Sequence, residues 1–516
     1  MSGARTELEF KLRTPMGVQA DAVQAALSGS GLTATPVGTK SRSDLYCDDD
    51  RRSLLRAGIS LRVRSDAHGA LVCAKSAISR VGALYARSET EAEWTSTASP
   101  QRASELPESV RDAVEPFVPR ADLHPIVRLD VERELLSLSR GDDTLGEIAI
   151  DRVTAEQNGR RTTFFEIEIE SRGDLDACRE AADRLLAALP AEIAVDDKLL
   201  HSLTLLALIP APQQDAEEPA TLGESVSRRL AALHHSMCAA ESRVRSEGRP
   251  EDVHSLRVAI RRLRVVLAAF ESMLPTPITT AAKERLAALH RRCGDLRATD
   301  VHLQDLPDAL QRVPEALRIP AIEVERRLAT RREEELERVR AFLRSDERLD
   351  ELVELARLCD LATYSQDAAS QPASAARDAI RSAARRVERR VKAIGKQPPL
   401  DETHRLRLVT KRLRILGEEF ADAAPAMKKR TRRRLLVALA AMGAWCDRAD
   451  AVAQWTGMLT NLDGAQHAAS TGALLGALCA LANEDAEKAQ RGARKAIHRL
   501  DRDWLWRSLG LEPSGD

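Results

Sequence analysis

Through the first 208 residues, apolar and polar side chains alternate with a period of two, which is typical of β-strands. The most regular alternation lies in residues 163–170, where three apolar residues take one face and three glutamates take the other. About eight such segments follow one another, mostly in hairpin order, which favours an antiparallel sheet or a closed barrel. The interior of an eight-stranded barrel is filled by side chains or holds one small ligand.

The polar faces of these predicted strands carry charges of both signs. Glu7, Glu9 and Lys11 share one face of the first strand, and Arg62 and Arg64 share one face of a later strand. Outward-facing charges would form an ordinary solvated surface. Inward-facing charges would need a ligand and a metal ion to offset their desolvation. Periodicity alone leaves both arrangements open.

Residues 209–221 separate this part from the rest of the chain. They are rich in proline and acidic residues and poor in large apolar side chains, as is typical of a linker. After them, apolar positions recur with a helical period to about residue 509. We therefore predict an α+β multidomain protein. An N-terminal antiparallel eight-stranded β-barrel with flanking helices would span residues 1–208, and an all-α bundle would span residues 222–510.

The helical part contains an internal repeat, because residues 253–264 return as residues 403–414, 150 positions later. We divide it into a duplicated bundle of two repeats, about 222–365 and 372–510. Each repeat has one helix with four basic or potentially basic residues at one-turn spacing, beside a separate apolar face. These residues are His254, Arg257, Arg261 and Arg264 (the first basic stripe) and His404, Arg407, Lys411 and Arg414 (the second basic stripe). Like charges at this spacing repel, so their repetition favours an anionic ligand over a merely solvated helix face.

Composition separates the two halves further. The net charge is −1, yet residues 1–210 hold 26 Lys+Arg against 34 Asp+Glu, which leaves 52 against 45 in residues 211–516. An acidic half joined to a basic half indicates separate binding tasks. The eight cysteines form no CxxC pair, and no apolar run approaches the roughly 20 residues of a membrane span, so we expect a cytoplasmic protein. The sequence contains no P-loop, nucleophile elbow or HExxH motif, and with few aromatic residues nucleic-acid binding ranks low.

The charged residues of the first domain occur in the order of a known family. The motifs are Glu7-x-Glu9-x-Lys11, Leu61-Arg62-x-Arg64, Lys75, Arg87-x-Glu89, Asp151 and Glu166-x-Glu168-x-Glu170. This order resembles the CYTH superfamily, the triphosphate tunnel metalloenzymes, over about residues 4–208. The resemblance implies that the strands form a tunnel with their charged faces inward. It also implies hydrolysis of inorganic triphosphate or thiamine triphosphate, or cyclisation of ATP.

The resemblance also assigns roles to single residues. It places seven basic residues in the catalytic site, most of them as phosphate ligands: Lys11, Arg62, Arg64, Lys75, Arg87, Arg133 and Lys198. It places five acidic residues near the metal: Glu7, Glu9, Glu168, Glu170 and Asp151. Mg²⁺ or Mn²⁺ is expected, because these ions take oxygen ligands and keep water molecules that can attack phosphorus. Arg128, on the opposite face of the strand from Arg133, is left unassigned.

The pattern His-x-x-Arg-x-x-x-Arg/Lys-Arg-Leu-Arg, present in both repeats, resembles the CHAD domain (conserved histidine α-helical domain) over about residues 222–510. Such domains often follow a CYTH domain and are linked to binding inorganic polyphosphate, so both basic stripes are expected to bind it. The predicted function is metal-dependent hydrolysis of inorganic triphosphate or short polyphosphate, with polyphosphate bound by the helical domain. The alternatives are a thiamine or nucleoside triphosphatase, an adenylyl cyclase, or a non-catalytic polyphosphate-binding scaffold. Association with polyphosphate granules is left open.

Overall fold

The computed structural model describes residues 5–81, 84–96, 98–194, 196–209, 221–361, 372–395, 397–421, 429–461 and 468–500. For residues 5–7, 77–81, 84–88, 360–361, 429–430 and 468 it describes the backbone alone. The chain divides into two compact units, Met1–Ala216 with Glu241–Glu247, and Glu217–Ala240 with Gly248–Asp516. Most of the predicted linker 209–221 lies outside the described residues, as do positions 362–365 and 501–510 at the predicted ends of the repeats.

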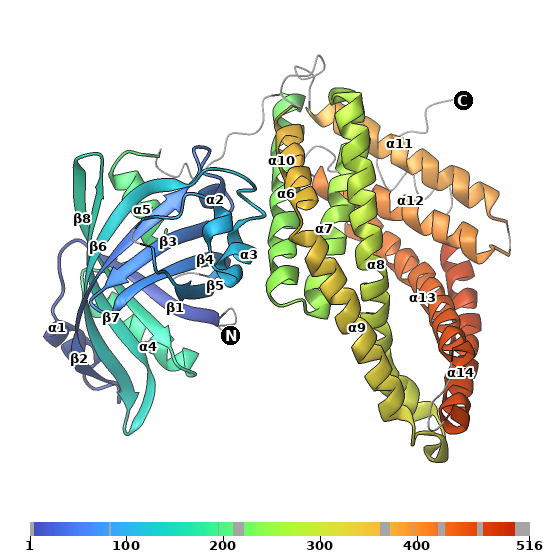
Figure 1. Cartoon of the computed structure of the whole chain (residues 1–516), viewed down its shortest axis with the longest axis horizontal. Helices are drawn as coiled ribbons and strands as arrows, with labels where there is room; N and C mark the ends of the chain where they lie inside the picture. Colours follow the sequence, from blue (N-terminus) through green and yellow to red (C-terminus); the bar gives the residue numbers. More distant parts are fainter. Residues whose placement is uncertain are drawn as a thin grey trace. The chain divides into compact units, whose positions relative to one another are not determined.

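The described part of the first unit contains nine antiparallel strands and several helices (Figure 1). The strands are β1 Arg5–Thr14, β2 Thr33–Asp48, β3 Ile59–Asp66, β4 Gly69–Val81, β5 Leu84–Glu93, β6 His124–Arg140, β7 Asp143–Gln157, β8 Arg160–Ser171 and β9 Glu192–Ile193. The helices are α1 Ala20–Leu27, α2 Ser53–Arg56, η1 Ala103–Glu105, α3 Glu108–Val114, α4 Leu175–Ala188 and α5 Lys198–Leu205.

The strands pair in the order β5-β4-β3-β2-β6-β7-β8-β1-β9, and β1 also pairs with β5. One edge of β1 pairs with β8, and the other edge pairs first with β5 and then, at Leu12 and Arg13, with β9. The pairings therefore return to β1 after eight strands. The predicted antiparallel architecture is confirmed, and the predicted barrel of eight strands differs in one detail, because β9 adds a ninth strand to the sheet. Two residues are too few to show an alternation in the sequence.

Helices cover the apolar faces of the strands on the outside of this ring. Phe10 and Leu12 of β1 pack in a buried cluster with α1 and α4, and Leu61 and Val63 of β3 pack in another with α3. Successive side chains of a strand point to opposite faces, so Glu9, Lys11 and the other charged residues between these apolar positions face the interior. The structure therefore settles what periodicity left open: the charged strand faces point inward.

The interior itself is partly apolar. Val131, Val153 and Phe164 cluster with Leu199 and Leu203 of α5. Each of these three residues lies two positions from an inward charged residue of its own strand (Arg133, Asp151 and Glu166), so α5 packs against the inward face. One part of the interior is therefore filled by an apolar core, and the charged part lies beside it.

After residue 221 the described chain is helical (Figure 1). Its elements are α6 Leu222–Ser246, α7 Pro250–Ala269, η2 Glu271–Met273, α8 Thr276–Arg312, η3 Glu315–Leu317, α9 Ala321–Leu343, α10 Asp346–Leu361, α11 Pro372–Ala393, α12 Leu400–Glu419, α13 Lys429–Thr460 and α14 Ala468–His498. By sequence position, α6–α9 correspond to α11–α14, so the predicted duplicated helical bundle is confirmed as an all-helical region. No helix within the described residues has the length and hydropathy needed to cross a bilayer.

Helices α7 and α12, which carry the two basic stripes, contact each other through equivalent residues. Arg262 lies 3.5 Å from the carboxylate of Glu418, and Arg412 donates to the carbonyl of Ala268 at 3.0 Å. Positions 262 and 268 of the first repeat correspond to 412 and 418 of the second, so the two contacts are reciprocal. The equivalent rings of Phe270 and Phe420 also pack together, with centroids 5.1 Å apart. Reciprocal contacts of this kind are those of a two-fold interface.

Candidate functional site

The inward faces of the strands surround a cavity of about 220 Å³ in the first unit. Each of β1 to β8, together with α5, contributes to its lining. The lining residues are Glu9, Lys11, Arg42, Tyr46, Ser60, Arg62, Arg64, Lys75, Glu89, Glu91, Arg133, Leu135, Glu147, Ala149, Glu168, Glu170, Asp197, Lys198 and Leu199. Most are charged, and both signs occur in quantity.

Nine of the twelve residues predicted for this site line the cavity: Glu9, Lys11, Arg62, Arg64, Lys75, Arg133, Glu168, Glu170 and Lys198. Asp151 is fully buried beside the cavity, where its carboxylate contacts Arg133 and Lys198. The side chains of Glu7 and Arg87 lie outside the described residues, although their backbones pair with each other across β1 and β5. Arg128 is exposed, as its strand parity requires. The roles of these residues stay predictions.

On one side of the cavity, carboxylates gather around buried ammonium groups. The Nζ of Lys198 lies 3.0 Å from Asp151, 2.9 Å from Glu166 and 2.6 Å from Glu168. The Nζ of Lys11 contacts Glu168 and also lies 3.1 Å from Glu9. Strand register explains these neighbours, because Lys11 pairs with Glu168. The β8 glutamates are thus placed among cations from three other elements.

The charges of this group stabilise one another. Burial alone would raise the pKa of Glu168, but Lys11, Lys198 and Arg133 hold it well below its usual value. Burial likewise opposes the charge on Lys198, yet Glu166, Glu168 and Asp151 raise the pKa of its ammonium group. Both signs of charge are therefore kept in place inside the domain.

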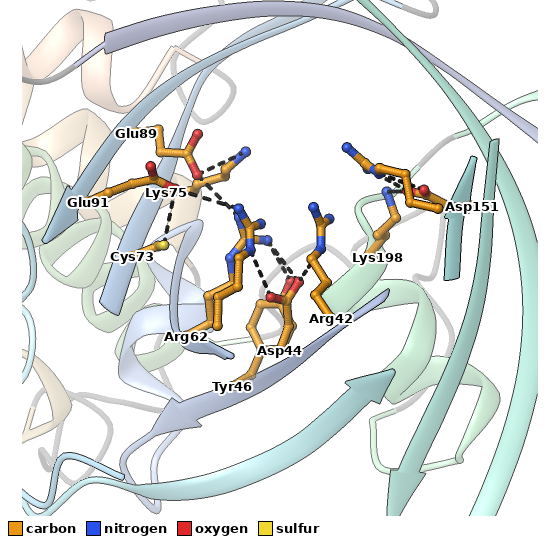
Figure 2. A network of polar contacts seen from close by, with 12 residues as sticks. Arg42, Asp44, Tyr46, Arg62, Cys73, Lys75, Glu89, Glu91, Asp151 and Lys198 are labelled. Carbon is orange, nitrogen blue, oxygen red and sulfur yellow. Dashed lines mark hydrogen bonds and ion pairs between the residues drawn. The ribbon is translucent and has the colours of Figure 1, made fainter. Parts of the chain in front are cut away.

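A second group lies where β2 meets β3, around the fully buried carboxylate of Asp44 (Figure 2). Asp44 is 3.5 Å from Arg62, 3.0 Å from Arg64 and 3.5 Å from Arg42. Arg62 also donates to the hydroxyl of Tyr46 at 3.2 Å. Burial would raise the pKa of Asp44, but the three guanidinium groups hold it well below its usual value. One carboxylate therefore serves three cations.

Arg42 is the least compensated of these cations. Burial, and then the nearby charges of Arg133 and Arg64, lower its pKa to about 10, which still leaves it charged at neutral pH. In Figure 2 its guanidinium lies between the Arg62 group on one side and the pair formed by Asp151 and Lys198 on the other. This position favours an anion in the cavity between the two groups.

Glu89 and Glu91 of β5 contact two of the same cations, Arg62 and Arg64. Glu89 lies 3.2 Å from both Lys75 and Arg62. Cys73 donates its thiol hydrogen to Glu91 at 3.2 Å. One ligand atom from each of Cys73, Glu89 and Glu91 lies within 4.8 Å of the others, and in the described part of the chain these three residues form a group that could hold a metal ion.

The acids predicted near the metal form a row across three neighbouring strands. Glu9 of β1 pairs with Glu170 of β8, which pairs in turn with Glu147 of β7. Like charges directly opposite each other on paired strands repel, and a divalent cation between them would remove this repulsion. Carboxylate oxygens are also the ligands that Mg²⁺ and Mn²⁺ prefer. The oxygen ligands present therefore suit the expected ion, although the carboxylate oxygens of these three described residues do not all lie within 4.8 Å of one another.

In the helical unit, the two basic stripes adjoin each other. Burial, and then the charges of Arg257, Arg407 and Arg414, lower the pKa of Arg261 to about 10. Burial, and then Arg261 and Arg407, lower the pKa of Lys411 to about 7. Each stripe therefore acts on the other across the contact between α7 and α12. We call the eight residues of the two stripes the basic cluster.

Two glycines leave room for guanidinium groups of the basic cluster. A Cβ atom at Gly443 of α13 would lie 2.9 Å from a terminal nitrogen of Arg407. A Cβ atom at Gly294 of α8 would lie 3.5 Å from a terminal nitrogen of Arg257. Each repeat thus places a glycine of its next helix against the second residue of its stripe.

Comparison with known families assigns each part of the chain to a domain family. The sequence model of the CYTH domain matches residues 5–190, and that of the CHAD domain matches residues 228–456. The chain carries a CYTH domain followed by a CHAD domain. The predicted family resemblances and their order are confirmed, while the wider extents 1–208 and 222–510 stay predictions. Among curated proteins, no sequence matches the chain.

Three solved structures are similar to parts of this chain. The CHAD domain from the plant Ricinus communis is 22% identical, with 56% of this chain and 97% of that chain covered and a TM-score of 0.44. PptA from Streptomyces chartreusis is 21% identical, with 54% and 99% covered and a TM-score of 0.44. HpAC1 from Hippeastrum, a putative adenylyl cyclase with a dominant triphosphatase activity, is 17% identical, with 41% and 100% covered and a TM-score of 0.28.

Several residues of the two sites were missed by sequence reasoning. In the CYTH domain, Arg42, Asp44 and Tyr46 alternate along β2, and this alternation was a usable signal. In the CHAD domain, His290 contacts the first basic stripe. His290 belongs to α8, so the sequence pattern of α7 does not include it. A residue supplied by a neighbouring helix leaves no mark on the pattern of the helix that it supports.

Proposed function

We propose that the CYTH domain hydrolyses inorganic triphosphate or a related short polyphosphate with the help of a divalent metal ion. We further propose that the CHAD domain binds polyphosphate. The first proposal is supported above all by the three guanidinium groups of Arg42, Arg62 and Arg64 around the single carboxylate of Asp44. They line one side of a cavity that Arg133 and Lys198 line on another.

A linear chain of phosphoryl groups suits this arrangement. Each guanidinium has five N–H donors, so a contact with Asp44 leaves Arg62 and Arg64 with further donors for phosphate oxygens. Charge-assisted contacts of this kind contribute roughly 1.5–3 kcal/mol each. Asp44 would position the guanidinium groups, and Lys75, Arg133 and Lys198 would bind phosphate oxygens further along the chain.

The row formed by Glu9, Glu170 and Glu147 would hold Mg²⁺ or Mn²⁺. When bound, such an ion supplies a water molecule for attack on phosphorus and offsets the charge that develops there. The carboxylate of Glu168, held by Lys11 and Lys198, would fix the two ammonium groups beside the phosphates. Lys11 and Lys198 would then stabilise negative charge on the transferred phosphoryl group.

The proposal is tested by measuring phosphate release from tripolyphosphate, thiamine triphosphate and ATP, using the full chain with Mg²⁺ or Mn²⁺. We expect release from tripolyphosphate, and its loss when a chelator removes the metal. Glu9→Gln should lower the rate at least about 10- to 100-fold, the loss typical of disturbing groups that position a metal. Glu132→Gln is the matched control, because Glu132 is exposed on β6 and contacts only the exposed Arg152 among the ion pairs of the described residues.

If phosphate is released faster from thiamine triphosphate or ATP than from tripolyphosphate, the proposed substrate is wrong but the proposed metal-dependent hydrolysis stands. Absence of release from all three, with either metal, would contradict the hydrolase and leave a polyphosphate-binding scaffold. Polyphosphate binding by the CHAD domain is supported by the basic cluster, in which five arginines and two histidines accompany Lys411 and the charges of the two stripes act on one another. Such a concentration of like charge favours an extended polyanion.

A further inference from the structure

The two halves of the basic cluster differ in the acids around them. In the second stripe, Arg407 lies 3.4 Å from Asp447, and Arg414 lies 3.8 Å from Glu418. In the first stripe, none of the three arginines forms an ion pair with a described residue, and the same holds for the neighbouring Arg297 of α8. The first half is therefore the less neutralised of the two.

The first stripe is held in place by a neutral group. The backbone carbonyl of His290 accepts a hydrogen bond from Arg257 at 2.7 Å, and the ring Nε2 of His290 lies 3.3 Å from Arg261. Burial, and then Arg257 and Arg261, lower the pKa of His290 to about 3, so its ring is neutral and can accept a hydrogen bond. The position 150 residues later is Ala440, which offers no such side chain. Arg257 and Arg261 are thus oriented without losing their charge.

The next helix of each repeat adds opposite charges. On α8, Arg297 faces the first stripe: after burial, its charge is the largest of those that lower the pKa of His254. On α13, the position 150 residues later is Asp447, and Asp450 lies near it and near Arg407. Two acids act on the first half. Asp295 opposes the lowering of the Arg257 pKa that burial causes, and Asp300, the equivalent of Asp450, acts on Arg297 while it forms its own ion pair with Arg332. Neither acid forms an ion pair with the four arginines of the first half, whereas Asp447 and Glu418 form ion pairs with Arg407 and Arg414 in the second.

We propose that the first half of the basic cluster, formed by Arg257, Arg261, Arg264 and Arg297, binds a short oligophosphate by itself. The second stripe adds affinity only for chains long enough to reach it. Cations that are partly buried and unpaired are unfavourable unless an anion joins them, and this condition holds for the first half. The second contact of a long chain is intramolecular, so it raises affinity without being needed for a short ligand. The inference rests on the proposed binding of polyphosphate by the CHAD domain.

The duplication supplies two matched pairs of single variants. The first pair compares Arg261→Gln with Lys411→Gln, and the second compares Arg257→Gln with Arg407→Gln. Each pair removes one positive charge from equivalent positions of the two stripes. Binding of tripolyphosphate and of long-chain polyphosphate is measured by calorimetry on the full chain, without metal so that neither is hydrolysed. All variants carry Arg62→Ala and Arg64→Ala to suppress binding in the CYTH domain. At about pH 6, below the Lys411 pKa of about 7, the paired changes remove comparable charge.

We expect Arg261→Gln to weaken the binding of both ligands by about 10- to 100-fold, the worth of one charge-assisted phosphate contact. Lys411→Gln should leave tripolyphosphate binding within about two-fold and weaken only long-chain binding, because the second contact is lost. Equal losses of tripolyphosphate binding in the two variants would overturn the inference but keep the proposed function. Unchanged long-chain binding in both pairs would instead contradict polyphosphate binding by the cluster. Thermal unfolding of each variant shows whether a loss of binding is caused by misfolding. If a variant of the first pair misfolds, the same comparison of tripolyphosphate and long-chain binding is made with Arg257→Gln and Arg407→Gln.

Discussion

Asp44 shows how a single side chain sets the charge balance of a site. It contacts three guanidinium groups, so the cavity of the CYTH domain has fewer acids than cations on the side formed by β2 and β3. In the CHAD domain, neighbouring arginines likewise alter the charge of Lys411, whose pKa lies near neutrality. In both places, the surroundings rather than the residue type determine how strongly the charge acts.

The pKa of Lys411 predicts that polyphosphate binding depends on pH. Burial, Arg261 and Arg407 lower this pKa to about 7, so the ammonium group loses its proton as the pH rises through that value. Long-chain affinity should therefore fall by about 3- to 10-fold between about pH 6 and pH 8, the difference between a charge-assisted and a neutral hydrogen bond, since the uncharged amine can still donate to phosphate. Burial, and then Arg297, lower the pKa of His254 below its ordinary value, which favours the neutral ring and reduces its contribution in that window.

Lys411→Arg should remove most of this dependence, because arginine stays charged throughout. Affinity is measured at each pH at constant salt, since phosphate contacts are sensitive to ionic strength. Lys488→Arg is the control: Lys488 is exposed and pairs with Glu484 on α14. If Lys411→Arg keeps the pH dependence of the unchanged protein, another group causes it.

At the level of elements, the sequence predicted more about the strands than about their surroundings. Alternation identified which residues share a face, and Glu9, Lys11, Arg62 and Arg64 all line the cavity as expected. It did not show which face is inward, because that depends on where α1, α3 and α4 pack in three dimensions. The family resemblance supplied this choice. The apolar contact of α5 with the interior was also beyond periodicity. In that part of the strands the apolar residues face inward and exposed Asp130, Glu132 and Arg152 face outward, so alternation alone could not show that α5 packs inside.

The glycine of α13 gives a test of the space around the second stripe. Gly443→Ala should raise helix stability by up to about 1 kcal/mol, the difference in helix propensity. It should also weaken polyphosphate binding several-fold, because the new Cβ atom would lie 2.9 Å from Arg407 and displace its guanidinium group. Thermal unfolding and long-chain polyphosphate affinity are measured on the same samples.

Gly294→Ala is the matched control, because its Cβ atom would lie 3.5 Å from Arg257, an ordinary contact distance. The same gain in helix propensity is expected there, with affinity close to that of the unchanged protein. Equal affinity in both alanine variants would show that the position of the Arg407 guanidinium group does not affect binding.

For the whole molecule, the division of charge along the chain predicts two separable activities. Replacing four residues of the basic cluster with glutamate should abolish long-chain polyphosphate binding: Arg257, Arg261, Arg407 and Lys411. Hydrolysis of tripolyphosphate should stay within about two-fold, because the cavity residues are unchanged. A control with the same change in net charge replaces four exposed arginines, Arg326, Arg338, Arg405 and Arg491. If the control loses binding to the same extent, net charge rather than the cluster attracts the polyanion.

The two-domain order and the duplication were readable from the sequence because each leaves a change of period or a recurring motif. The inequality of the two repeats was not readable, since it depends on which acids lie beside which arginines. Asp447 and Arg297 stand outside the recurring motif, on helices that only the structure places against α12 and α7.

The reciprocal contacts of α7 and α12 are those that two identical subunits make in a symmetric dimer. In such a dimer every substitution is present twice, so an improvement on one side of the symmetry axis is imposed on the other. Joining both copies in one chain removes that constraint. Position 297 is arginine here while position 447 is aspartate, a difference that a homodimer cannot encode. The duplicated chain is therefore free to give a polyanion a direction, with one end of the bound chain held more tightly than the other.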